Sequence, residues 1–98
     1  MDDGQAIARR RVRIVNAYGL HMRPSTKFVT IAARFRAEVW VVYQGARVNG
    51  KSILEMTTLA AECGSMLDLE AKGDDAEGAV VALAALIDGG FFMEDEPA

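Results

Sequence analysis

The order in which strand-like and helix-like hydrophobic patterns follow each other constrains this fold most strongly. β-Branched and aromatic runs, or alternation of apolar and polar residues, predict strands at residues 12–15, 38–43, 46–49 and 66–71. Helical spacing predicts helices from about residue 22 to 33, from residue 53 to about 63, and from residue 74 or 75 to about 87. The predicted order is therefore β-α-β-β-α-β-α.

Local signals support the starts and ends of these helices. Ser52 and Glu55 form a Ser-x-x-Glu capping box, so a helix should begin at Ile53, and Gly64 should end it. Pro24 is tolerated in the first turn of the first helix, where amide groups have no acceptor within the helix.

Strands with one apolar face and three amphipathic helices predict an α+β fold. The simplest arrangement is one mainly antiparallel sheet with all helices on one side, and Phe28 and Trp40 in the core. A length of 98 residues gives room for one domain. We expect a flexible leader at residues 1–8, the domain at residues 9–88 and an acidic tail at residues 89–98.

Composition excludes several classes of protein. Cys63 is the only cysteine, so the chain has no internal disulfide and no cysteine metal cluster, and a lone thiol suits a reducing compartment. No segment is long and apolar enough to span a membrane, and the first residues lack the order of a secretion signal. We expect a cytoplasmic monomer that needs no metal or cofactor.

The charges are unevenly distributed along the chain, whose formal net charge is −3. Residues 1–51 carry ten Lys or Arg and three Asp or Glu, whereas residues 52–98 carry one and eleven. Such asymmetry can mark a basic face that meets a partner. We favour the simpler interpretation, in which folding mixes the two halves. The acidic total argues against nucleic-acid binding.

One segment has the residue types of a phosphate site: residues 16–25, Asn-Ala-Tyr-Gly-Leu-His-Met-Arg-Pro-Ser. It places His21, the only histidine, at the expected start of a helix. Neutral imidazole offers a nitrogen nucleophile, and a helix start presents N–H groups and partial positive charge that suit a phosphate. Arg23 adds a fixed charge and a fork of donors. On spacing alone, however, a structural role is favoured, in which His21 caps the helix and Arg23 is solvated.

A family resemblance changes that balance. Residues 19–25 closely resemble the active-site signature of HPr, the histidine phosphocarrier of the bacterial sugar phosphotransferase system. Residues 48–54, Val-Asn-Gly-Lys-Ser-Ile-Leu, resemble the loop and helix that bear the family's regulatory serine. The resemblance covers about residues 9–87, and two separated motifs at the family's spacing make it specific.

The resemblance implies an HPr-like open-faced β-sandwich, with a four-stranded antiparallel sheet in the order 1-4-2-3 and three helices on one face. It implies that His21 accepts a phosphoryl group on its Nδ1 (pros) nitrogen from phospho-enzyme I and donates it to enzyme IIA-type proteins. Arg23 matches the arginine that stabilises the phosphate. The chain would then be a phosphoryl carrier rather than a turnover enzyme.

The resemblance also implies a regulatory and a docking role for nearby residues. Ser52 matches the serine that HPr kinase/phosphorylase modifies in many family members, which is compatible with its role in the capping box. The family docks partners through this region, so we expect Met22, Ile53 and Leu54 to contact them, with core packing as the alternative for Leu54.

Three residues depart from the family pattern. Met22 replaces a small residue, Ser25 stands where alanine is common, and Glu55 places acidic charge near the docking face. An alternative function is that of a regulatory HPr-like protein, either in a nitrogen-type relay or as a Ser52-controlled partner. A small ligand- or RNA-binding module is a third interpretation, which the acidic balance and the lack of a base-stacking motif disfavour.

Overall fold

The computed structural model describes residues 7–92. Its strands are β1 (Ile7–Arg13), β2 (Glu38–Tyr43), β3 (Ala46–Asn49) and β4 (Met66–Lys72). Its helices are α1 (Met22–Ala32), α2 (Ile53–Thr58) and α3 (Ala76–Asp88), followed by the short 3-10 turn η1 (Gly90–Phe92). The predicted order of strands and helices is confirmed.

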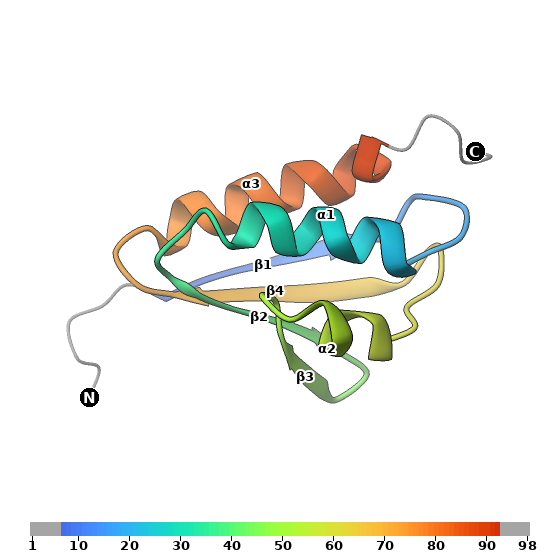
Figure 1. The fold of residues 1–98 in the computed structure, drawn as a ribbon, viewed down its shortest axis with the longest axis horizontal. Helices are drawn as coiled ribbons and strands as arrows, with labels where there is room; N and C mark the ends of the chain where they lie inside the picture. Colours follow the sequence, from blue (N-terminus) through green and yellow to red (C-terminus); the bar gives the residue numbers. More distant parts are fainter. Residues whose placement is uncertain (1–6, 93–98) are drawn as a thin grey trace.

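The four strands form one antiparallel sheet in the order β1-β4-β2-β3. Helices α1 and α3 run side by side across the sheet, and α2 lies near α1 at the β3 end (Figure 1). The expected α+β open-faced sandwich, with sheet order 1-4-2-3, is therefore confirmed. Within residues 7–92, none of the helices combines the length and apolar character that a membrane crossing requires.

The core lies between the sheet and the helices. Strand β4 alternates as predicted, with Leu67, Leu69 and Ala71 fully buried on the helix side. Phe28 of α1 packs into the same core with no exposed surface. Burial of each large apolar side chain stabilises the fold by about 1.5–3 kcal/mol.

The other face of the sheet is open and charged. Arg11 of β1 lies opposite Asp68 of β4, with Nε 2.9 Å from Oδ1, and Arg9 Nε lies 3.6 Å from Glu70. Folding therefore does bring basic residues of the first half against acidic residues of the second. Each exposed pair contributes about 0–1 kcal/mol.

The expectation of Trp40 in the core is wrong. Its neighbours Val39 and Val41 point inward, so the two-residue period of β2 turns Trp40 to the open face. There Trp40 is half-buried, and the Arg47 guanidinium lies 4.1 Å from the centroid of the indole ring in a cation–π contact.

The first strand starts earlier than the sequence suggested. Residues 7 and 8, assigned to the leader, pair with Lys72 and Ala71 of β4, and β1 ends at Arg13 rather than at residue 15. Four arginines on β1 hid the strand, because local hydrophobicity cannot detect a charged edge strand that pairs along one side. The remaining leader, residues 1–6, lies outside the described residues.

Helix α2 is shorter than predicted, because it ends at Thr58 rather than near Cys63. Ala60 adopts a positive φ of 51°, and the chain leaves the helix. The following residues bond to the end of β1 instead: Gly64 N–H donates to Ile14 O at 2.7 Å, and Ile14 N–H donates to Ser65 O at 2.9 Å. Tertiary hydrogen bonds replace the expected last turns of the helix.

The region assigned to the tail begins with ordered structure. Phe91 in η1 is fully buried, and Lys27 Nζ donates to its carbonyl at 2.9 Å. The acidic residues 94–96 lie outside the described residues.

Asp75 ties the start of α3 to the loop between α1 and β2. It occupies the N-cap position of α3, but its side chain makes no capping hydrogen bond there. Its carboxylate accepts instead from the N–H groups of Arg36 and Ala37, each at 2.8 Å. The hydrogen bond from Arg36, followed by that from Ala37 and the charge of Lys51, lowers the pKa of Asp75 below its usual value of 3.8.

We predict that Asp75→Asn lowers the free energy of unfolding at pH 7, because one amide donor loses its charged acceptor. A depressed folded-state pKa means that this stabilisation is complete above the usual pKa and is lost as the pH falls through the folded-state pKa. In urea unfolding, the gap to wild type should therefore shrink as the pH falls below about 4. Asp74→Asn, at the exposed neighbour, is the control. A gap that does not change with pH would contradict this assignment.

Gly19 lets the segment before α1 pack tightly against the loop after α2. Its φ is +71°, and a Cβ at this position would lie 2.3 Å from the Ala61 carbonyl oxygen. That carbonyl already accepts from Leu20 N–H at 2.8 Å, so the two backbones cannot separate without losing this bond.

We predict that Gly19→Ala destabilises the protein by about 2–4 kcal/mol, from backbone strain plus overpacking. Gly45→Ala is a matched control, since Gly45 has a similar φ of +82° and a Cβ added there would meet no atom within 4 Å. The control should cost only about 1–2 kcal/mol. Equal losses in urea unfolding would show that the Ala61 contact is unimportant.

Candidate functional site

His21 lies at the N-cap of α1, where its backbone is extended (φ −100°, ψ −166°) and its side chain makes no capping hydrogen bond. Its imidazole is half-buried. The backbone around it is held from both sides, because His21 N–H donates to Gly19 O at 3.1 Å and His21 O accepts from Ser25 N–H at 3.0 Å. The interpretation in which the side chain merely caps the helix therefore fails.

The turn before His21 is held by Asn16, a residue whose role the sequence pattern did not reveal. Its side chain is buried, and Nδ2 donates to Gly19 O at 2.7 Å. Gly19 N–H donates in return to Asn16 O at 3.1 Å. Asn-x-x-Gly is a turn-forming pattern, so its spacing could have indicated this reciprocal bonding.

Tyr18 is a second residue that the sequence pattern did not single out. Its ring is 66% exposed and stands edge-on to His21, with ring centroids 6.3 Å apart and an interplanar angle of 72°. This contact borders one side of the imidazole. No sequence signal predicts it, because the pairing depends on the conformation of the turn.

Arg23 stands two residues beyond His21 in the first turn of α1 and is exposed. The first backbone N–H groups of a helix have no acceptor within the helix. Among the first three residues of α1, Met22 and Arg23 have such an N–H group, whereas Pro24 has none. The first turn contains no acidic residue. The partial positive charge of this helix end and the Arg23 guanidinium therefore favour an anion beside His21.

The three residues predicted to contact partners are all exposed apolar side chains. The exposed fraction is 57% for Met22, 37% for Ile53 and 77% for Leu54. Core packing, the alternative for Leu54, is therefore wrong. Helices α1 and α2, which carry these residues, contact each other.

Ser52 caps α2 as the capping box predicts. Its Oγ accepts from Glu55 N–H at 3.2 Å. The second half of the box differs, because the Glu55 carboxylate accepts from the N–H of Asn49 at 2.9 Å rather than from Ser52. Glu55, one of the departures from the family pattern, thus holds the loop before α2 in place.

Ser25 is fully buried, and its Oγ has no hydrogen-bond partner. It lies on the face of α1 that also buries Phe28. A buried unpaired hydroxyl costs about 1–3 kcal/mol. The alanine common at this position in the family would avoid that cost, and nothing nearby explains why a serine stands here.

The arrangement is suited to transfer of a group rather than to enclosed catalysis. A half-exposed nitrogen nucleophile stands at a helix N-terminus with an arginine two residues on, and the exposed Met22 and Tyr18 flank it in the chain. Within residues 7–92, no cluster of three or more His, Cys, Asp or Glu side chains is arranged to hold a metal ion.

Comparison with known proteins agrees with this geometry. Residues 8–89 match the family model described as the phosphorylation site of the HPr component of the phosphotransferase system. The phosphocarrier protein HPr of Neisseria meningitidis is 45% identical over 88 residues, covering 90% of this chain and 98% of the relative. The phosphocarrier protein NPr of Shewanella violacea is 37% identical over 82 residues, covering 84% and 90%.

A solved structure shows the same fold. The crystal structure of an HPr from Thermoanaerobacter tengcongensis matches with a TM-score of 0.85 and 38% identity, covering 89% of this chain and 98% of that one. With a family model that spans most of the chain, this chain belongs to the HPr family of phosphocarrier proteins of the phosphotransferase system.

Proposed function

We propose that this protein acts in the cytoplasm as a phosphoryl carrier, accepting the group on His21 from phospho-enzyme I and donating it to enzyme IIA-type proteins. One observation carries the proposal: the only histidine of an HPr-family chain stands at the N-cap of α1, beside Arg23 and without a side-chain capping bond. This is the position and residue type that phosphoryl acceptance requires.

The transfer step uses the Nδ1 lone pair of neutral imidazole, with the proton on Nε2. Nδ1 forms a bond to phosphorus while the bond between phosphorus and the donor breaks, and the donor keeps that electron pair. The dianion then lies near the start of α1, where amide groups, the helix dipole and Arg23 stabilise it. In the donation step, a nucleophile of the acceptor protein forms a bond to phosphorus while the bond between Nδ1 and phosphorus breaks, and Nδ1 keeps that electron pair.

Partner docking in this proposal uses exposed apolar side chains of α1 and α2, two helices that contact each other. Met22 on α1 and Ile53 and Leu54 on α2 present apolar surface next to charged residues. A carrier must meet a donor and an acceptor in turn. A shallow apolar surface suits this, because it can be buried by different partners without a conformational change.

We predict that incubation with enzyme I, magnesium and labelled phosphoenolpyruvate gives an acid-labile label on wild type and none on His21→Ala. Arg23→Gln should still be labelled, but about tenfold more slowly, because it loses a charge-assisted hydrogen bond to phosphate. Arg10→Gln, at an exposed arginine of β1, is the control and should behave as wild type. No label on wild type, with an enzyme I shown to be active on its own carrier, would remove the relay proposal.

Regulation at Ser52 is part of the same proposal, with HPr kinase/phosphorylase as the modifying enzyme. A phosphate at this helix start is favoured by the dipole of α2, and it would add negative charge to the docking face beside Ile53 and Leu54. Repulsion from an acidic partner would then slow transfer.

We predict that Ser52→Asp slows phosphoryl transfer from enzyme I, whereas Ser52→Asn does not. Both residues are good N-caps, so both variants keep α2 and differ only in charge. The difference should shrink as salt rises from about 0.05 M to about 1 M, because screening shortens the reach of the charge. Equal transfer rates for the two variants at low salt would contradict charge-based regulation.

A nitrogen-type relay is the second candidate, favoured by the similarity to the NPr of Shewanella violacea. Parallel labelling reactions with a sugar-type and a nitrogen-type phosphodonor separate the two. Faster labelling of His21 by the nitrogen-type donor would assign the protein to that relay, and faster labelling by enzyme I would assign it to sugar uptake.

A further inference from the structure

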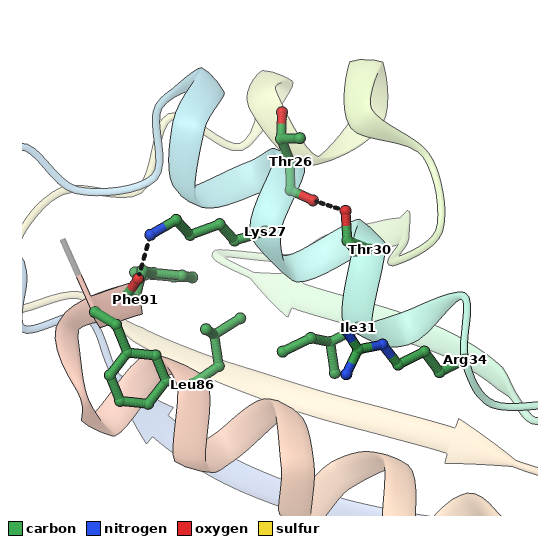
Figure 2. Close-up of a pocket in the computed structure, with 8 residues that line it drawn as sticks. Thr26, Lys27, Thr30, Ile31, Arg34, Leu86 and Phe91 are labelled. Atoms are coloured by element: carbon green, nitrogen blue, oxygen red, sulfur yellow. Dashed lines mark hydrogen bonds between the residues drawn. The ribbon is translucent and has the colours of Figure 1, made fainter.

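A groove runs between α1 and the end of the chain that the structure describes. We call it the α1–η1 groove. It is lined mainly by Lys27 and Ile31 of α1, by Arg34 just after this helix, and by Leu86, Phe91 and Phe92 across from them. Its volume is about 290 Å³, and Figure 2 shows Ile31 and Leu86 facing each other across it. Small-molecule sites start at about 300 Å³. A groove of this size suits a few residues of extended peptide.

The groove has an apolar floor and cations at its rim. Leu86 and Phe91 are buried, while Phe92 is 65% exposed. Lys27 Nζ donates to Phe91 O at 2.9 Å, and Arg34 lies at the opposite end of the groove (Figure 2). Within residues 7–92, no carboxylate forms an ion pair with either Lys27 or Arg34. Helix α1 itself contains no acidic residue.

The residues that follow Phe92 have matching chemistry. Residues 93–98 read Met-Glu-Asp-Glu-Pro-Ala, so three consecutive acidic residues stand between two apolar ones. They begin at the groove itself, because Phe92 is one of its lining residues. Burial of Phe91 and its bond to Lys27 hold this starting point in place.

The length of the segment is also sufficient. Six extended residues reach about 20 Å. Arg34 stands seven positions after Lys27, which corresponds to about 10 Å at the rise of an α-helix. A tether this short gives an effective concentration of about 1 mM or more, so a weak contact is enough to keep the segment bound.

We propose that residues 93–98 fold back into the α1–η1 groove, with their apolar side chains against Ile31 and Leu86 and their carboxylates against Lys27 and Arg34. The segment then neutralises Lys27, on the helix that begins beside His21, and Arg34, just after the end of that helix. An acidic partner surface that contacts Lys27 or Arg34 has to displace it first. This proposal does not rest on the proposed function, because neither His21 nor Ser52 takes part.

Methyl and amide NMR spectra of the full chain at about 0.02 M salt test the contact directly. The comparison variant replaces Glu94, Asp95 and Glu96 with Gln, Asn and Gln, which keeps the length and removes the charges. We expect the Ile31 and Leu86 methyl signals to differ between the two proteins, while those of Val48, on β3, coincide. Raising the salt to about 1 M should move the wild-type signals toward those of the variant, because the Debye length falls to about 3 Å.

A variant that reverses the charge of one residue of the groove provides a second test. Arg34→Glu should shift the Ile31 and Leu86 signals toward those of the neutral-tail variant, and Arg10→Glu on β1 should not. Ile31 and Leu86 signals that are identical in wild type and neutral-tail variant at both salt concentrations would overturn the proposal. So would a difference that vanishes on dilution, because the groove would then bind the tail of a second copy.

Discussion

The position of β4 between β1 and β2 is the constraint that determines the pairing of the sheet, the core and the end of the sheet where the candidate site lies. Its pairing sets Leu67 opposite Val12 and Leu69 opposite Val41, so the inward residues of three strands form one apolar surface. Because side chains alternate along a strand, a slip by one residue would turn the two leucines to solvent and the carboxylates of β4 into the core. That cost restricts the sheet to one register.

The same register brings the end of β1 next to the start of β4, and the candidate site follows at this end of the two strands. Bonds between Ile14 and Ser65, and between Leu20 and Ala61, join the segment before α1 to the segment after α2. His21 is therefore held on a rigid backbone while its ring remains half-exposed. A group that must be passed between two proteins needs this combination, since an enclosed site would exclude the second protein.

Charged residues are arranged differently on the open face of the sheet and on helix α1. On the open face of the sheet, Arg11 and Asp68 form a close pair, and Glu70 lies between Arg9 and Arg47. Helix α1, by contrast, carries cations and no acidic residue. A chain with a net charge of −3 thus presents a basic helix beside its only histidine. Charge counted along the sequence could not show this, because it depends on which residues the sheet pairs.

Features that rest on local chemistry could be predicted from the amino-acid sequence. These are the order of the strands and helices, the inward face of β4, the Ser52 cap of α2 and the place of His21 at a helix start. The start of β1, the end of α2 and the side of the sheet that Trp40 faces could not. Those depend on tertiary contacts: the pairing of Ile7 with Lys72, the bonds from residues 14 and 20 to the loop after α2, and the register that sets Val39 and Val41 inward. Local propensity acts over a few residues, whereas these pairings join residues that are 28 (Val41 and Leu69) to 65 (Ile7 and Lys72) positions apart, so they form only in the folded chain.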